Sequence, residues 1–285
     1  MFEFMKFIFE DRITDTFSFK PFSLCHILYL LIIIAAIIMT VIFCKNKDKV
    51  VKEKIINVVL NTALCLYVAD FFIMPLAMGH IQIIKLPFHL CTLMSIMCFL
   101  SRHTKFFSKY KNSFTILGMI GALMYLTYPA GVNNSQGDFF DGYTYRIIQT
   151  VLYHGLMVAQ GVFAIAFGEI ELKWKNFKYD IISVLGLTVL AMLANSIYTG
   201  EVYEQCECVE GCTEMILVYD LEPNWFFVQH DALYAFPNDT DGYYAPFMMI
   251  GAIIGMCALV RVISQELLKR FKVQEKKEEV VKLLN

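Results

Sequence analysis

Cys91 is the residue of this chain best suited to covalent chemistry. A thiol becomes an effective nucleophile when an imidazole removes its proton. His89 lies only two positions away, and residues two apart on a helix do not face each other. We therefore expect the base to come from a different helix, where His154 is the best candidate. Asp70 could orient its imidazole as the acid of a catalytic triad does, and His89 could bind a developing oxyanion.

Three further polar side chains are expected to contact a substrate: His26, Asn195 and Arg146. Ionisable and amide groups are costly in hydrocarbon, so each needs a partner or a function. Taken singly, His26 or Asn195 is more often an interhelical hydrogen-bond partner. Their occurrence as a group favours a functional site.

Zinc binding is an alternative, because three imidazoles and a thiolate are sufficient ligands. The spacing differs from the metalloprotease pattern, which places two histidines at i and i+4 on one helix. We therefore expect no metal and no other cofactor. Simple packing by Cys91 is a second alternative, and pairing of Asp70 with Arg146 or a tyrosine is a third.

These residues lie in or beside apolar stretches that are long enough to cross a membrane. Of the 285 residues, 58% are hydrophobic and 18% charged, whereas soluble domains have about a quarter charged. A helix needs roughly 20 apolar residues to cross ~30 Å of hydrocarbon. The predicted fold is an all-α membrane bundle of seven transmembrane helices, at Phe22–Cys44, Ile55–Gly79, Leu86–Ser101, Phe114–Ala130, Tyr145–Gly168, Ile181–Tyr198 and Ala245–Gln265.

The connections between these helices alternate sharply in basic residues. Segment 45–54 holds five lysines, 102–113 an arginine and three lysines, and 169–180 three lysines. The opposite connections hold Lys85 alone. Basic residues stay on the cytoplasmic side during insertion, so the N-terminus is predicted outside and the C-terminus in the cytoplasm.

Three segments are expected outside the bundle of residues 22–266. Residues 1–21 mix aromatic and charged residues, as in a segment at the membrane surface. Residues 267–285 form a charged cytoplasmic tail. The outer loop 199–244 has ten carboxylates and Cys206, Cys208 and Cys212, and is long enough to have structure of its own.

The predicted topology brings the polar groups to similar depths. At ~1.5 Å per residue, His26, Cys91 and Asn195 lie roughly 6 to 8 Å below the outer ends of their helices. By the same rise, Asp70 and His154 lie about 14 Å below theirs. The inner half is expected to hold almost no such groups. We therefore expect one site, formed by several helices, in the outer half of the bilayer.

The motif Leu86-Pro-Phe-His-Leu-Cys91 resembles the L-P-x-H-L-C signature of the YwaF-like integral membrane family, which includes eukaryotic transmembrane protein 164. Weaker similarities are FSLCHILYL around His26, the Tyr128–Pro129 turn, Gln149 with His154, and Asn195, together covering roughly residues 20–265. The resemblance implies seven spans and, from the eukaryotic branch, a phospholipid acyltransferase that uses a Cys and a His. By position these are Cys91 and His154, with Tyr128 beside the substrate. The SIYTG stretch after Asn195 and the long acidic loop depart from the family pattern.

The expected function is a lipid acyltransferase or hydrolase of the cell membrane. In this hypothesis Cys91 attacks an ester carbonyl, His154 moves the proton, and membrane lipids are the partners. No nucleic acid partner is expected. The alternatives are a small-ligand transporter or receptor-like binder that uses the same polar cluster, and a purely structural role.

Overall fold

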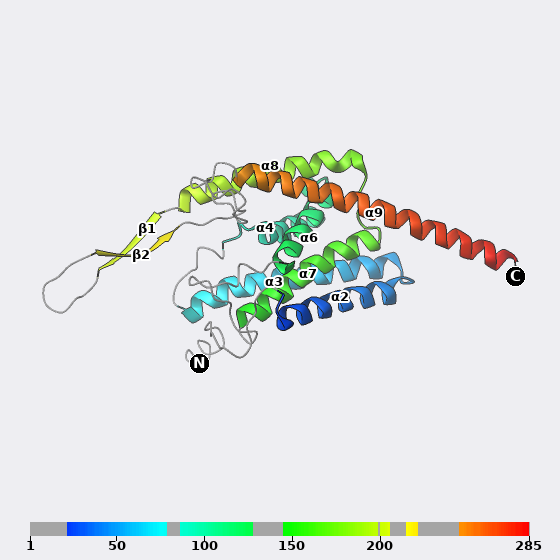
Figure 1. Ribbon diagram of the computed structural model, residues 1–285, viewed down its shortest axis with the longest axis horizontal. Helices are drawn as coiled ribbons and strands as arrows, with labels where there is room; N and C mark the ends of the chain where they lie inside the picture. Colours follow the sequence, from blue (N-terminus) through cyan, green and yellow to red (C-terminus); the bar gives the residue numbers. More distant parts are fainter. Residues whose placement is uncertain are drawn as a thin grey trace.

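The computed structural model describes residues 22–78, 86–127, 145–198, 200–205, 215–221 and 245–284. A helix lies at each of the seven predicted segments (Figure 1). The helices are α2 Leu24–Cys44, α3 Lys49–Met78, α4 Leu90–His103, α6 Lys111–Thr127, α7 Tyr145–Ala166, α8 Phe177–Tyr198 and α9 Ala245–Leu284. Two short elements, α5 (Lys105–Ser108) and the 3₁₀ turn Trp174–Asn176, lie in the basic connections.

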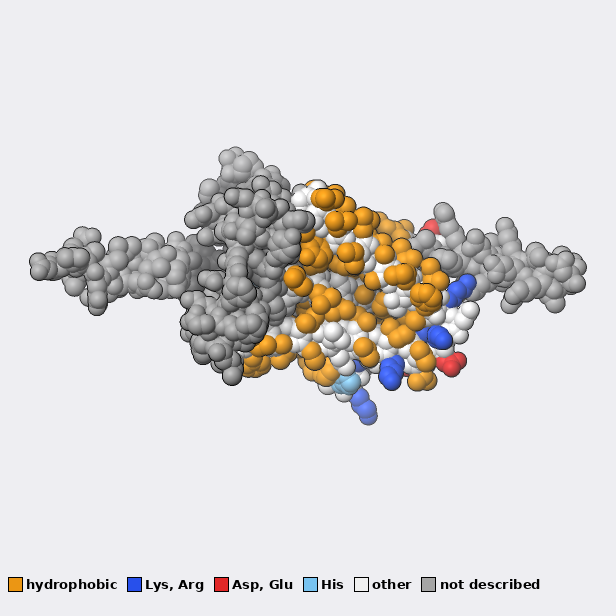
Figure 2. Space-filling view, turned by 90° about the horizontal axis from the view of Figure 1, so that it is seen from below, with side chains coloured by type: hydrophobic (Ala, Val, Ile, Leu, Met, Phe, Trp, Pro, Cys, Tyr) orange, Lys and Arg blue, Asp and Glu red, His pale blue; other side chains and the backbone are white. Residues whose placement is uncertain are grey.

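Five helices of the described chain are long and apolar enough to cross a membrane: α2, α3, α7, α8 and α9. Their outer faces carry large apolar side chains that are open to the surroundings, such as Ile32, Val189 and Leu193. Figure 2 shows such side chains over much of one face of the molecule, with lysine and arginine side chains toward one end. A soluble protein rarely exposes so much contiguous apolar surface. The protein is a membrane protein with several apolar helices.

Helix α6 lies at the centre of the bundle. It packs against α4, α7, α8 and α9, while α2 and α3 pack on the far side of α7 (Figure 1). Its residues Ile116, Leu117 and Ala122 have no exposed surface. The short helices α4 and α6 therefore make most of their contacts with protein.

Two glycines allow α7 to approach its neighbours closely. A Cβ atom at Gly161 would lie 2.6 Å from Cβ of Met119 on α6. A Cβ atom at Gly155 would lie 3.0 Å from the end of the Ile33 side chain on α2. Small residues at such positions let helix backbones pack tightly in membranes.

We predict that Gly161→Ala destabilises the fold by about 1–3 kcal/mol, because the added methyl group forces α6 and α7 apart. SDS-driven unfolding in mixed micelles would measure the change. Gly186→Ala on α8 is the matched control, since nothing lies within 4 Å of its Cβ position. Equal destabilisation by both substitutions would contradict this account of the α6–α7 contact.

Helix α4 begins four residues later than predicted. His89 is its N-cap residue, with an extended ψ of 143°, and the Phe88 amide donates to the Leu86 carbonyl at 2.8 Å in a turn around Pro87. The turn and the extended N-cap residue occupy 86–89, so the helix starts at Leu90. In contrast, α3 and α8 begin six and four residues before the predicted spans Ile55–Gly79 and Ile181–Tyr198.

Two of the segments expected outside the bundle contain regular structure. Within 199–244, strand β1 (Gly200–Gln205) pairs antiparallel with β2 (Met215–Leu221), with an irregularity between Val202 and Tyr203. This hairpin is a β element in a fold predicted to be all-α. Helix α9 continues through the charged tail to Leu284. Residues 1–21 and the three loop cysteines lie outside the described residues.

Candidate active site

Helix α4 places Cys91 in its first turn, two residues after the N-cap residue His89. The first backbone bond of the helix joins the Leu93 amide to the His89 carbonyl at 2.9 Å. The amides before Leu93 have no acceptor one turn earlier in the helix. Those of Cys91 and Thr92 lie against the Cys91 sulfur. The partly exposed thiol therefore lies beside backbone N–H donors at the positive end of a helix.

His154 on α7 brings its imidazole to this sulfur. Its Nε2 atom lies 3.3 Å from Cys91 Sγ, and its Nδ1 atom lies 2.7 Å from the Thr150 carbonyl oxygen. A carbonyl only accepts hydrogen bonds, so Nδ1 carries the proton of the neutral ring and donates it. Nε2 then presents its lone pair to the thiol and accepts from the Cys91 S–H. This is the tautomer in which the imidazole can remove the thiol proton.

Two tyrosines that the sequence reasoning missed hold the imidazole in place. Tyr125 on α6 stacks on the His154 ring, with centroids 3.9 Å apart and planes 10° apart. Tyr153 meets the same ring edge-on at 5.0 Å, and its hydroxyl donates to the Cys91 carbonyl at 3.1 Å. The stacked ring would also stabilise a protonated imidazole. The sequence offered one signal for each tyrosine: Tyr153 directly precedes His154, and Tyr125 lies on the neighbouring helix.

A backbone carbonyl contacts His154, the residue that Asp70 was predicted to orient. Asp70 is buried on α3, one turn after Tyr67, whose ring lies 6.4 Å from that of Tyr153. The Nδ1 partner of His154 is the Thr150 oxygen, one turn earlier on α7. This carbonyl fixes the tautomer of the ring, and the orienting role expected of Asp70 stays a prediction.

His26 on α2 makes hydrogen bonds through both ring nitrogens, one to the start of its own helix and one to α6. Its Nδ1 accepts from the Phe22 amide at 2.9 Å, so Nε2–H donates to the Leu126 carbonyl at 2.6 Å. Its ring is 1% exposed. The bond to Leu126 matches the alternative that His26 is an interhelical hydrogen-bond partner. The substrate contact predicted for His26 stays a prediction.

The structure gives less detail for the other residues that were predicted to contact a substrate. Asn195 is buried near the end of α8. Arg146 lies in the first turn of α7, but its side chain lies outside the described part of the structure. Tyr128 also lies outside the described residues.

The expectation that the other half of the bundle holds almost no polar groups is wrong. Arg261 on α9 and Asp180 on α8 form an ion pair with no exposed surface, and Arg261 Nε donates to Asp180 Oδ2 at 3.0 Å. Arg102 and Glu169 form a second, largely buried pair. Gln160 is fully buried on α7. A lone arginine inside the predicted span Ala245–Gln265 was the signal that could have revealed the first pair.

Among the described residues, no three His, Cys, Asp or Glu side chains are grouped so that they could hold a metal ion. The chain matches the model of the TMEM164 family over residues 21–264, which include every site residue described above. No curated protein and no solved structure matches it significantly.

Proposed function

The chain belongs to the TMEM164 family, and on this basis we propose that it transfers or hydrolyses lipid acyl esters through Cys91 and His154. The observation that carries the proposal is the 3.3 Å approach of His154 Nε2 to Cys91 Sγ. Cys91 and His154 lie 63 positions apart in the sequence and on different helices, so the fold brings them together. Packing alone would not require the Nε2 lone pair to face the thiol.

The reaction begins when Cys91 Sγ attacks the ester carbonyl carbon and its proton passes to His154 Nε2. The carbonyl oxygen becomes an oxyanion, and the amides of the first α4 turn are the nearest donors for it. His89, at the same helix end, is a further candidate donor. When the C–O bond breaks, Nε2–H protonates the leaving alcohol and an acyl thioester remains on Cys91.

The second half of the reaction releases the acyl group. An alcohol of a second lipid, or water, gives its proton to Nε2 and attacks the thioester carbonyl. The thiolate leaves and recovers the proton from Nε2–H, which restores the thiol and the neutral imidazole. The choice between lipid alcohol and water decides between transferase and hydrolase.

We also propose that α4 and α6 belong to the membrane domain together with the five long helices, with the N-terminus outside and the C-terminus in the cytoplasm of the cell. Support comes from the meeting of the three basic connections at one end of the bundle, where Lys49, Lys111 and Glu169 line one cavity. Helices α4 and α6 are short, at ~21 and ~26 Å. Irregular backbone at their ends is tolerated where protein surrounds it.

A lipid-like thiol electrophile tests the proposal on the full-length protein in detergent. We expect labelling of Cys91 and its loss in His154→Ala, because the thiol then has no base. Cys257 and Cys98 are buried and should stay unlabelled. Equal labelling of Cys91 in the unmodified protein and in His154→Ala would contradict the enzyme proposal.

A further inference from the structure

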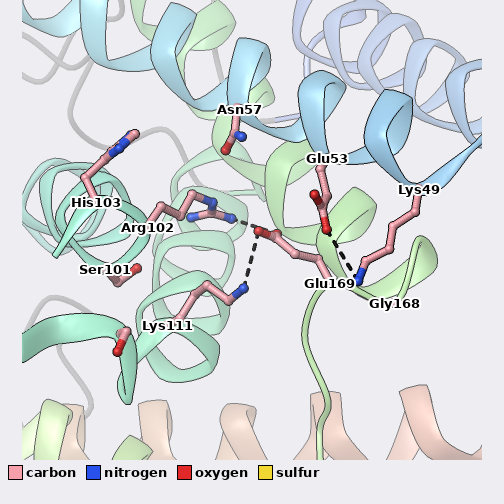
Figure 3. A pocket seen from close by; sticks show the side chains of 10 residues that line it. Lys49, Glu53, Asn57, Ser101, Arg102, His103, Lys111, Gly168 and Glu169 are labelled. Carbon is pink, nitrogen blue, oxygen red and sulfur yellow. Dashed lines mark hydrogen bonds and ion pairs between the residues drawn. The ribbon is translucent and has the colours of Figure 1, made fainter. Parts of the chain in front are cut away.

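A polar cavity of about 500 Å³ lies at the other end of α4 from Cys91. Figure 3 shows its lining: Lys49, Glu53 and Asn57 from α3, Ser101, Arg102 and His103 from α4, Lys111 from α6, and Gly168 and Glu169 after α7. Arg102 lies eleven residues after Cys91, which is ~17 Å along the helix. The cavity is therefore separate from the proposed catalytic pair.

The cavity has more positive than negative charge. Glu169 Oε2 accepts from Arg102 Nη2 at 2.9 Å, and Lys111 Nζ lies 3.6 Å from Glu169 Oε1. One carboxylate thus faces two cations (Figure 3). Lys49 lies 3.7 Å from Glu53 in an exposed pair. Three cations with two carboxylates leave a net positive charge.

Hydrogen bonds to the backbone fix the positions of Glu169 and Arg102. Gly168 ends α7 with a φ of 73°, and the next amide, that of Glu169, donates to the Ala164 carbonyl at 2.9 Å. This turn fixes the Glu169 carboxylate beside Arg102. Arg102 Nη1 also donates to the Cys98 carbonyl at 3.1 Å, while its Nε has no acceptor among the described residues. Arg102 therefore keeps one buried donor without an acceptor in the described part of the chain.

Lys111 is the cation best placed to receive a ligand. Its contact with Glu169 is longer than a hydrogen bond, and 30% of its side chain is exposed. Its three donors can therefore turn toward an incoming anion. Lys109, one half-turn away, instead lies over the rings of Phe106 and Tyr110 and does not line the cavity.

We propose that this cavity binds a phosphate group, as carried by the headgroup of an anionic lipid or by a small soluble phosphate ester. Its volume suits a headgroup and greatly exceeds that of a water molecule. Arginine and lysine recognise phosphate through charge-assisted hydrogen bonds. The three surrounding connections carry twelve basic and five acidic residues. Of these, Glu171 pairs with Lys173, which lowers the pKa of Glu171, and neither lines the cavity.

The test measures binding of fluorescent dioctanoyl phosphatidylglycerol to the full-length protein in detergent by anisotropy. We expect Lys111→Gln to weaken binding about 5-fold and Lys49→Gln/Lys111→Gln about 25-fold, at ~1 kcal/mol per lysine. Lys111→Arg should retain binding. Lys109→Gln is the matched control and should bind like the unmodified chain, because Lys109 does not line the cavity.

Competition distinguishes the sources of the phosphate. Displacement by unlabelled phosphatidylglycerol at far lower concentration than by glycerol 1-phosphate supports a lipid headgroup, and equal displacement supports a soluble ester. The proposal is overturned if Lys109→Gln weakens binding as much as Lys111→Gln. It is equally overturned if net-neutral dioctanoyl phosphatidylcholine competes as well as the anionic lipid.

Discussion

Replacing Cys91 with alanine should reduce turnover of a lipid acyl ester by about 10³-fold or more, since the covalent route is lost. Replacing His154 with glutamine should cost about 10²- to 10⁴-fold, the usual contribution of a general base. Because thiol and imidazole act as one unit, the double variant should be little worse than the more damaging single variant. Acyl transfer between labelled lipids in detergent or vesicles would measure all three.

Cys98→Ala is the matched control for the loss of Cys91. Cys98 lies two turns further along α4 and is fully buried, close to Gly118 on α6. This variant should retain turnover, although the small cavity it leaves can lower stability. Full turnover by Cys91→Ala, or multiplicative losses in the double variant, would contradict a joint role for the two side chains.

Asp180→Leu should destabilise the protein by about 3–5 kcal/mol, because it leaves Arg261 buried without its counter-charge. Arg261 also donates to the Lys173 carbonyl at 3.2 Å and lies 5.7 Å from the centre of the Phe177 ring. The pair therefore anchors α9 to the start of α8. SDS-driven unfolding followed by circular dichroism would measure the loss.

The double variant Asp180→Leu/Arg261→Met should recover most of this stability, since apolar replacement of a complete buried pair is often neutral. Glu53→Gln breaks the exposed Lys49 pair and should cause no measurable change. If Asp180→Leu were as harmless as Glu53→Gln, the buried pair would not be anchoring α9. Failure of the double variant to recover would show that the carboxylate has another essential partner.

Apolar blocks of about 20 residues were enough to predict where the helices lie, because membrane helices satisfy their backbone groups internally. Their ends were harder to predict. The turn around Pro87 and the N-cap at His89 delay α4, and helix α3 continues into the basic connection to Lys49. Neither helix boundary coincides with a change in the apolar pattern of the sequence. Hydropathy also could not predict that α9 continues through the charged tail.

The candidate site was only partly predictable. Depth along the predicted helices favoured Cys91 and His154 as neighbours, and their atoms lie 3.3 Å apart. Their roles as nucleophile and base remain predictions. The Thr150 carbonyl and the Tyr125 ring could not be foreseen, because a backbone acceptor has no sequence signature and ring stacking depends on the rotation of α6 against α7.

The buried charges at the basic end escaped prediction for a different reason. Asp180 and Glu169 lie in the segment 169–180 that was predicted to be a connection, where carboxylates among lysines suggest a solvated surface. Their partners, Arg261 and Arg102, come from other helices. Only tertiary packing shows that these charges are buried together.

Mass spectrometry of the full-length protein after brief incubation with a lipid acyl donor examines the covalent step itself. The account predicts an acyl group attached to Cys91 as a thioester, which neutral hydroxylamine removes and which does not form in His154→Gln. An acyl group on another residue, or lipid turnover in a protein whose Cys91 never acquires one, would contradict it.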